Sequence, residues 1–121
     1  MKPVFLILLV FITCQGFSQS VKVPEIGLEV MTEDLNKITM GWYEAKKACD
    51  SLGNGWRLPS IDELEKIYNF KNEIGDFQKR FYWSSTDYGN GYAWSFTFHI
   101  GNAINNYKLN SYYVRAVRTL K

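Results

Sequence analysis

The sequence has few cysteines and histidines and almost no net charge. Its 121 residues include two cysteines, Cys14 and Cys49, and one histidine, His99. A structural zinc site needs three or four such ligands, so we expect no metal centre. A framework of disulfides is also excluded, because it needs several cysteine pairs. The formal net charge of +2 gives no basic surface for nucleic acid, and we expect none as a partner.

Motifs that carry catalysis are missing as well. There is no G-x-S-x-G sequence and no glycine-rich loop that would hold a phosphate. The calcium-dependent sugar motifs EPN and WND do not occur, and Asp87 with Asn90 falls short of the six to eight oxygen ligands of a calcium ion. The acidic first turn around Glu63 is what a helix dipole favours. We therefore expect no enzymatic activity and no cofactor.

Only one long apolar run is present, from Val4 to Thr13, and it follows the charged Lys2. Small residues come next, and the whole pattern over residues 1–20 predicts a signal peptide cleaved after Ser18 or Ser20. The run is shorter than the roughly 20 residues that span a bilayer, so the mature chain has no predicted transmembrane segment. We expect an exported protein, in the periplasm, at the cell surface or secreted, with one domain over residues 21–121.

Two helices are predicted from apolar spacing. The residues Trp42, Ala45, Ala48, Cys49 and Leu52 recur at intervals of three and four, which indicates an amphipathic helix over residues 41–52. Ser60 and Glu63 form a capping box that begins the second helix. Its predicted inward residues are Ile61, Leu64, Ile67 and Tyr68.

The rest of the chain is predicted to form strands, giving an α+β class. Residues 21–24 are interpreted as a tail, and strands are expected over residues 26–31, 82–86 and 113–119. Over residues 92–100 the period changes to two, which predicts one buried and one wet face. The expected buried set is Tyr92, Trp94, Phe96, Phe98 and Ile100, and the expected wet set is Ala93, Ser95, Thr97 and His99.

A polar stretch over residues 101–113 separates the last two predicted strands. It is open to two interpretations, because asparagine and glycine favour solvated turns, while asparagine and tyrosine are also typical of binding loops. In the second interpretation one displayed surface binds a ligand. The candidate ligand-binding residues are Tyr88, Asn90, Asn102, Asn105, Asn106, Tyr107, Asn110 and Tyr112.

Five sequence blocks carry a family resemblance over residues 27–118. They are WYEAKKAC, GWRLPSIDEL, YWSST, YAWSFTFHIG and YVRAVR, in that order. This order resembles the Lcl C-terminal-type domain and the related Fibrobacter succinogenes major paralogous domains. The resemblance implies a C-type-lectin-like fold, with two helices flanking a small twisted antiparallel sheet and a long loop region that presents a ligand face. The polar stretch also resembles the variable region of C-type-lectin-like proteins diversified by retroelements.

One departure from the family pattern concerns Cys49. Relatives often carry a second cysteine in the last block, and Ala116 stands in that place here. The resemblance therefore implies that Cys49 is unpaired, and we expect it to be buried as a small apolar residue. We interpret Arg57, Arg115 and Arg118 as structural clamps.

The resemblance and the composition lead to one functional interpretation and one alternative. We expect a secreted, non-enzymatic ligand-binding or adhesion domain that uses the Asn/Tyr-rich surface to bind a protein or glycan at the bacterial cell surface. The alternative is a structural or assembly module of the bacterial cell envelope.

Overall fold

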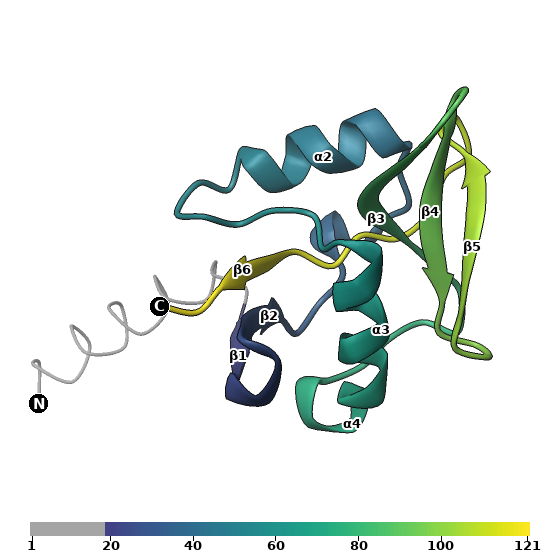
Figure 1. Ribbon diagram of the computed structural model, residues 1–121. Helices are drawn as coiled ribbons and strands as arrows, with labels where there is room; N and C mark the ends of the chain where they lie inside the picture. The colour runs from purple at the N-terminus through teal and green to yellow at the C-terminus, as the bar shows by residue number, and fades with distance from the viewer. Residues whose placement is uncertain (1–18) are drawn as a thin grey trace, which may run out of the picture.

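The computed structural model describes residues 19–121, so most of the predicted signal peptide lies outside the described residues. Two small antiparallel sheets lie on opposite sides of helix α3, and helix α2 runs along the top of the molecule (Figure 1). The helices are α2 (Trp42–Asp50), α3 (Ile61–Asn69) and α4 (Lys71–Ile74). The strands are β1 (Ser20–Val23), β2 (Leu28–Met31), β3 (Phe81–Gly89), β4 (Tyr92–Thr97), β5 (Asn102–Tyr107) and β6 (Val117–Thr119). The α+β class is confirmed.

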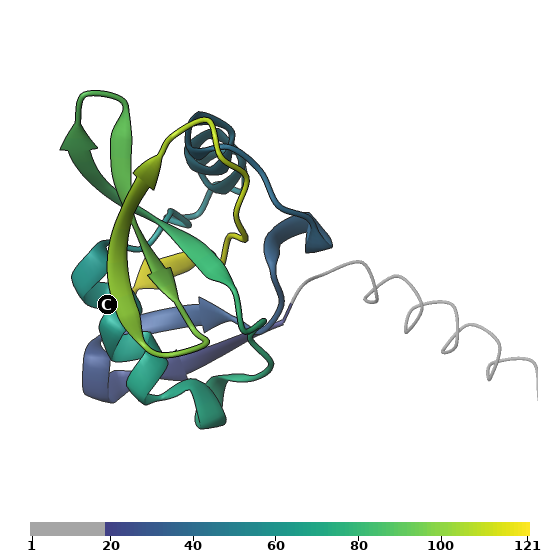
Figure 2. The same cartoon turned by 90° about the vertical axis from the view of Figure 1, so that its right-hand side faces the viewer.

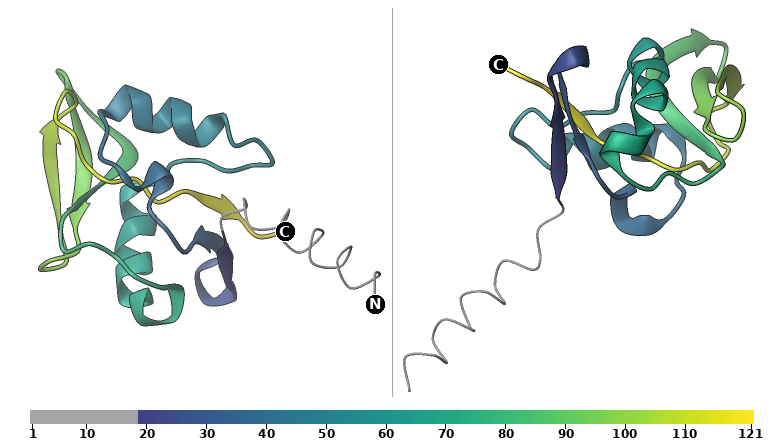
Figure 3. Two further views of the ribbon diagram at one scale, coloured as in Figure 1. Left: turned by 180° about the vertical axis from the view of Figure 1, so that it is seen from behind. Right: turned by 90° about the horizontal axis from the view of Figure 1, so that it is seen from below.

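The first sheet brings the two ends of the described chain together. Its strand order is β1-β2-β6, and we call it the terminal sheet. The views from behind and from below show the C-terminal segment beside the hairpin of β1 and β2 (Figure 3). The interpretation of residues 21–24 as a tail was wrong, because Val21 pairs with Val30 and Val23 with Leu28 in a regular ladder. The strand predicted over residues 26–31 is shorter, since Pro24–Ile26 form a 3-10 turn before β2.

Both predicted helices are confirmed. In α3 the Ser60 hydroxyl accepts a hydrogen bond from the Glu63 backbone N–H at 3.2 Å, and the Glu63 carboxylate accepts one from the Ser60 N–H at 2.9 Å. The apolar faces point inward, with Leu64 of α3 and Ala45 of α2 fully buried, but Leu52, which the spacing also included, lies beyond the end of α2 and is exposed. The part of the chain described here contains no helix long and apolar enough to cross a membrane.

The second sheet has the order β3-β4-β5, and we call it the outer sheet. It contains the main correction to the sequence interpretation. The polar stretch is not one long loop, because residues 102–107 form β5 and pair with β4 along its whole length. Strand β4 ends at Thr97, and residues 98–101 make the turn into β5. The segment predicted as a strand over residues 113–119 is a strand only at Val117–Thr119.

The two faces of β4 are also distributed differently from the prediction. Ala93, Ser95 and Thr97 were expected to be wet and are buried, while Tyr92 and Ile100 were expected to be buried and are exposed. The Ser95 hydroxyl is satisfied inside the protein, because it donates to the Ile104 carbonyl at 2.9 Å. Alternating apolar and polar residues indicate that a strand has two different faces, but the elements that pack on each face decide which residues are buried.

Two buried tryptophans connect α2 to the outer sheet. The Trp42 indole N–H donates to the Ser84 carbonyl at 2.8 Å, and the Trp83 indole N–H donates to the Met40 carbonyl at 2.9 Å. Cys49 lies in the same core cluster, is a free thiol and has no exposed surface. Burial raises the pKa of Cys49 to about 12, so the thiol behaves as a small apolar side chain.

Candidate functional site

One side of the outer sheet carries exposed aromatic side chains at the end farthest from the chain termini (Figure 1). Tyr92 of β4 lies opposite Tyr107 of β5, and Trp94 lies opposite Asn105. Directly paired residues share a face of a sheet, so these four side chains lie on one side. Tyr88, near the end of β3, packs against Trp94. We call Tyr88, Tyr92, Trp94, Asn105 and Tyr107 the outer aromatic face.

The aromatic rings of this face support one another. The rings of Tyr88 and Trp94 meet edge to face, with centroids 5.4 Å apart, and those of Tyr92 and Tyr107 are 5.8 Å apart. Tyr88 is 55% exposed, Tyr107 46% and Tyr92 40%. Ring pairs of this kind lose little conformational entropy when a ligand covers them, because they are already ordered.

The chemistry of the outer aromatic face is neutral. It offers phenol hydroxyls, an indole N–H and a carboxamide, so it can stack against apolar groups and exchange hydrogen bonds without a charge. The nearest ion pair in β3 lies on the other side of the sheet, where Asp87 is opposite Ala93 and its carboxylate is 3.0 Å from the Lys108 ammonium. A hydrogen bond from the Gly89 N–H and another from Lys108 lower the pKa of Asp87. This pair holds the end of the sheet against α2, since Lys108 also lies 4.2 Å above the Trp42 ring.

The structure brings together only part of the predicted site. Tyr88, Asn105 and Tyr107 lie on the outer aromatic face. Asn90 lies beside it in the exposed β3–β4 turn, where a φ of 54° places it in the left-handed region that asparagine tolerates.

The other four predicted residues lie elsewhere, so the expectation of a single surface is not met. Asn102 and Asn106 point to the opposite side of β5, and the Asn106 amide donates to the Ser95 hydroxyl at 2.6 Å. The Asn110 amide donates to the Tyr112 hydroxyl at 3.1 Å. Tyr112 is half-buried and packs against Phe81 and Trp83. The physical reason is the two-residue period of a strand, which separates neighbours that a loop would have displayed together.

Sequence reasoning missed Tyr92 and Trp94 as surface residues. It placed them with Phe96 because all three share one face of β4. Helix α3 covers that face only at Phe96, where the Tyr68 ring packs at 5.5 Å, and does not extend to Tyr92. The change from phenylalanine to tyrosine and tryptophan along the strand is the signal that could have revealed this, since the latter two have a polar group that prefers water.

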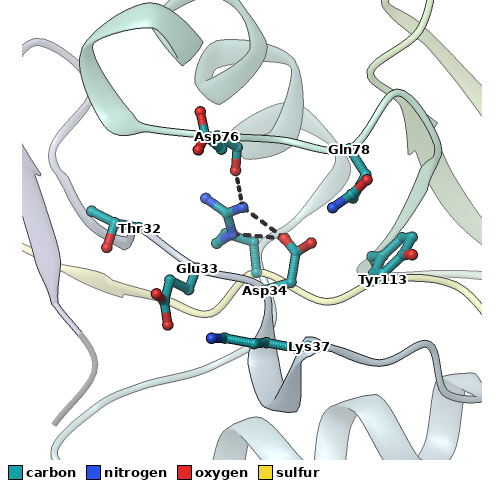
Figure 4. A pocket seen from close by; sticks show the side chains of 8 residues that line it. Thr32, Glu33, Asp34, Lys37, Asp76, Gln78 and Tyr113 are labelled. Atoms are coloured by element: carbon teal, nitrogen blue, oxygen red, sulfur yellow. Dashed lines mark hydrogen bonds and ion pairs between the residues drawn. The ribbon is translucent and has the colours of Figure 1, made fainter.

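A polar hollow lies around Arg115, whose guanidinium forms hydrogen bonds with residues that line it. Figure 4 shows Asp34 and Asp76 converging on the guanidinium that these two residues bind. Arg115 donates to the Asp34 carboxylate at 2.6 Å, to the Met31 carbonyl at 3.1 Å and to the Asp76 carbonyl, and it stacks on Phe77 at 3.9 Å. Arg115 is 1% exposed, so we assign it the structural clamp role that the sequence predicted.

Arg57 and Arg118 have the same kind of role. Arg57 donates two hydrogen bonds to Glu63 at 2.8 and 2.9 Å, and Arg118 donates to Glu29 at 2.9 Å and to the Asn54 carbonyl at 3.1 Å. His99 is exposed beside a shallow apolar groove, as expected of a rim histidine. Over residues 19–121, no three histidine, cysteine or acidic side chains gather in a way that would hold a metal ion.

Comparisons with known proteins were made for the sequence and for the fold. The family model described as the Lcl C-terminal domain matches residues 17–118. Curated protein sequences give no match. A structure titled as the complex of a von Willebrand factor A1 domain mutant (I546V) with botrocetin is similar, with a TM-score of 0.61, 11% identity and coverage of 83% of this chain and 95% of that chain. The crystal structure of botrocetin gives a TM-score of 0.59 with the same identity and coverages. The fold is C-type-lectin-like.

Proposed function

Because the chain belongs to the Lcl C-terminal domain family, we propose that it is a secreted, non-enzymatic ligand-binding or adhesion domain. In this proposal the outer aromatic face binds the ligand, with Asn90 at its edge. Loops and sheet ends on a rigid scaffold are the usual position of binding residues. The outer aromatic face meets that description, because the sheet is held on one side by α2, whose Trp42 shares a core cluster with Ala93, and on the other by α3, whose Tyr68 packs on Phe96.

The observation that carries the proposal is the exposure of three tyrosines on one uncharged side of the sheet. Single apolar residues on a surface are ordinary, whereas a gathered patch indicates an interaction site. Tyr88, Tyr92 and Tyr107 are each at least 40% exposed and are held by aromatic neighbours. Tyrosine and tryptophan are also the residues that contribute most in binding interfaces.

The ligand is a protein or a glycan without a dominant charge. No charged side chain belongs to the outer aromatic face, so a strongly acidic or basic partner would find no complementary group there. Botrocetin, which shares this fold, is described in a complex with a protein domain. By that analogy a protein surface is the first ligand class to test, and a neutral sugar ring, which also stacks on aromatic rings, is the second.

Export is part of the same proposal, and two described residues bear on the cleavage position. The Gln19 carbonyl accepts a hydrogen bond from the Thr32 N–H at 3.0 Å, and Ser20 is the first residue of β1. Cleavage after Ser18 keeps both contacts, whereas cleavage after Ser20 removes them. We expect amino-terminal sequencing of the exported protein to begin at Gln19, and an uncleaved protein retained in the cytoplasm would contradict the export proposal.

The test of binding compares matched tyrosine substitutions. The purified protein is applied to a glycan array and to intact bacterial and host cells, together with the variants Tyr88→Ala, Tyr107→Ala and Tyr43→Ala. Tyr43 is the control, because it is 62% exposed but lies on α2, outside the outer aromatic face. We expect the first two variants to lose about 5- to 100-fold in affinity, as hot-spot tyrosines do, and Tyr43→Ala to bind normally.

Two results would overturn this assignment. Equal binding by Tyr107→Ala and the unchanged protein would place the ligand elsewhere, as would a loss caused by Tyr43→Ala alone. Circular dichroism of each variant is the folding control.

A further inference from the structure

The outer edge of β5 has no neighbouring strand among residues 19–121. The sheet order is β3-β4-β5, so β5 is a terminal strand. Figure 1 places it at the outer side of the molecule, and Figure 2, seen from that side, shows β5 in front of the sheet. The Lys108 N–H donates to the Gly91 carbonyl at 2.9 Å, which continues the β4–β5 register. Backbone groups alternate along a strand, so those of Ala103, Asn105 and Tyr107 point away from β4.

This edge lacks the features by which proteins usually block strand addition. Charged residues, prolines and bulges are the common protections of an edge strand. β5 has the sequence NAINNY, and its pairing with β4 runs through six consecutive residue pairs without a shift. The opposite edge of the same sheet is covered, because the Trp83 N–H donates to the Tyr113 carbonyl at 3.0 Å and the Tyr113 N–H donates to the Phe81 carbonyl at 3.1 Å.

We propose that the β5 edge binds a second copy of this chain, in an antiparallel pairing centred on Asn105. In this register Asn105 lies opposite Asn105 of the second copy, and Ala103 lies opposite Tyr107 of the second copy. The small Ala103 side chain leaves room for the Tyr107 ring, and the two Asn105 carboxamides can form hydrogen bonds with each other. A single two-fold axis produces all of these contacts, as an isologous dimer requires.

The other side of the sheet supports the same register. Ile104 is 38% exposed and lies on the face opposite Asn105. The proposed pairing places it directly opposite Asn106 of the second copy and diagonally across from the second Ile104, so the added strand covers its side chain. The dimer therefore covers an isoleucine that is exposed in the single chain.

The absence of charge in β5 allows a second copy to pair with it and gives a charged peptide no complementary group. β5 itself is uncharged, and its pairing brings no two like charges directly opposite each other. A six-residue strand buries less area than a standard protein interface, so the expected dissociation constant is weak, about 10 µM to 1 mM.

The dimer would join two outer sheets into one continuous sheet. Its two-fold axis is perpendicular to that sheet, so the outer aromatic faces of both copies lie on the same side. If these faces bind ligand, as proposed above, the dimer binds a repetitive surface with two sites at once. Binding at the first site raises the effective concentration of ligand at the second, so the overall affinity increases. The dimer itself does not depend on that function.

Sedimentation equilibrium of the protein from 1 µM to 1 mM, without any ligand, tests the proposal. We expect the mass to rise from one chain to two. Asn105→Lys places two ammonium groups opposite each other and should raise the dissociation constant at least ten-fold. Asn110→Lys adds the same charge at an exposed position outside β5 and should change it less than two-fold. A monomer at 1 mM, or equal dimerisation of Asn105→Lys, would overturn the proposal.

A cysteine variant gives a second readout that does not depend on the strength of the dimer. Paired residues of an antiparallel ladder lie at Cα distances that a disulfide can bridge. Asn105→Cys should therefore form a disulfide-linked dimer under mild oxidation, whereas Asn110→Cys should remain a monomer. Cys49 does not interfere, because it is fully buried. Equal cross-linking of both variants would indicate random collision and would contradict the register.

Discussion

Different interactions stabilise the terminal sheet and the outer sheet. Around the terminal sheet, the three arginines near or within β6 each bind a carboxylate: Arg115 binds Asp34, Arg118 binds Glu29 and Arg57 binds Glu63. In the outer sheet the contacts are ring packing and neutral hydrogen bonds, and its ion pair, Lys108 with Asp87, involves an exposed carboxylate. Ion pairs therefore reinforce the region where the chain ends meet, while the outer sheet leaves an uncharged surface free for contact.

The largest effect is expected at the buried clamp. Arg115→Met leaves the Asp34 carboxylate, which is 8% exposed, without its cation, and removing one partner of a buried pair costs about 3–5 kcal/mol. Urea denaturation measures the free energy of unfolding. Arg57→Gln, at a pair whose arginine and glutamate side chains are 37% and 22% exposed, is the matched control and should cost about 1 kcal/mol or less. Equal effects of the two variants would remove the distinction between a buried clamp and a surface pair.

The next effect is expected at the turn between β4 and β5. Gly101 has a φ of +79°, and a Cβ there would lie 2.6 Å from the Tyr68 ring. Gly101→Ala combines backbone strain with a steric clash and should cost about 2–4 kcal/mol. Gly89→Ala is the control, because Gly89 has a φ of +91° with no atom within 4 Å of the added Cβ. Gly89→Ala should lower the free energy of unfolding only by the backbone strain, about 1 kcal/mol. Thermal denaturation of both variants measures the difference between them.

A smaller effect is expected from acid, and it should be located at the terminal sheet. Hydrogen bonds from Ser20 and Arg118 lower the pKa of Glu29 below its ordinary value of 4.5. A lowered folded-state pKa contributes stability above the unfolded value, and this contribution is lost as the pH falls through the folded value. The free energy of unfolding should therefore decrease as the pH falls below 4.5. Glu29→Gln should reduce that dependence, and a pH profile identical to that of the unchanged protein would contradict the assignment.

The smallest effect is expected on the outer aromatic face. Tyr107→Ala and Tyr88→Ala should each cost about 0.5–1 kcal/mol of the free energy of unfolding, since each removes one ring pair from a half-exposed side chain. Chemical denaturation of the binding variants provides the measurement. A loss of several kcal/mol would show that these rings support the fold, and the contrast between a clamped sheet and a free one would then fail.

Local signals in the sequence predicted the helices well. The capping box at Ser60 and the spacing of Leu64 with Ile67 act within one or two turns, so no distant residue is needed to interpret them. The strands were harder to predict from the sequence. β1 was taken for a tail and β5 for a loop, because their pairing partners lie in other parts of the chain and a polar strand such as NAINNY has no apolar alternation.

The candidate site was predicted in part, for the same reason. Composition grouped Tyr88, Asn105 and Tyr107 on one surface, and these three do share the outer aromatic face, but composition could not separate them from Asn106, which β5 turns to the opposite face. Tyr92 and Trp94 were hidden by an alternation that they share with the buried Phe96.

The sequence by itself determined the helices and the family. These depend on composition and on residues close together in the chain. Only the tertiary structure decided which side of β4 is covered, that the polar stretch forms a strand and that the β5 edge stays open. Those properties depend on where α2, α3 and the segment before β6 pack against the sheet. Burial is set by neighbours in space, and a strand's alternation is the same whichever of its faces they cover.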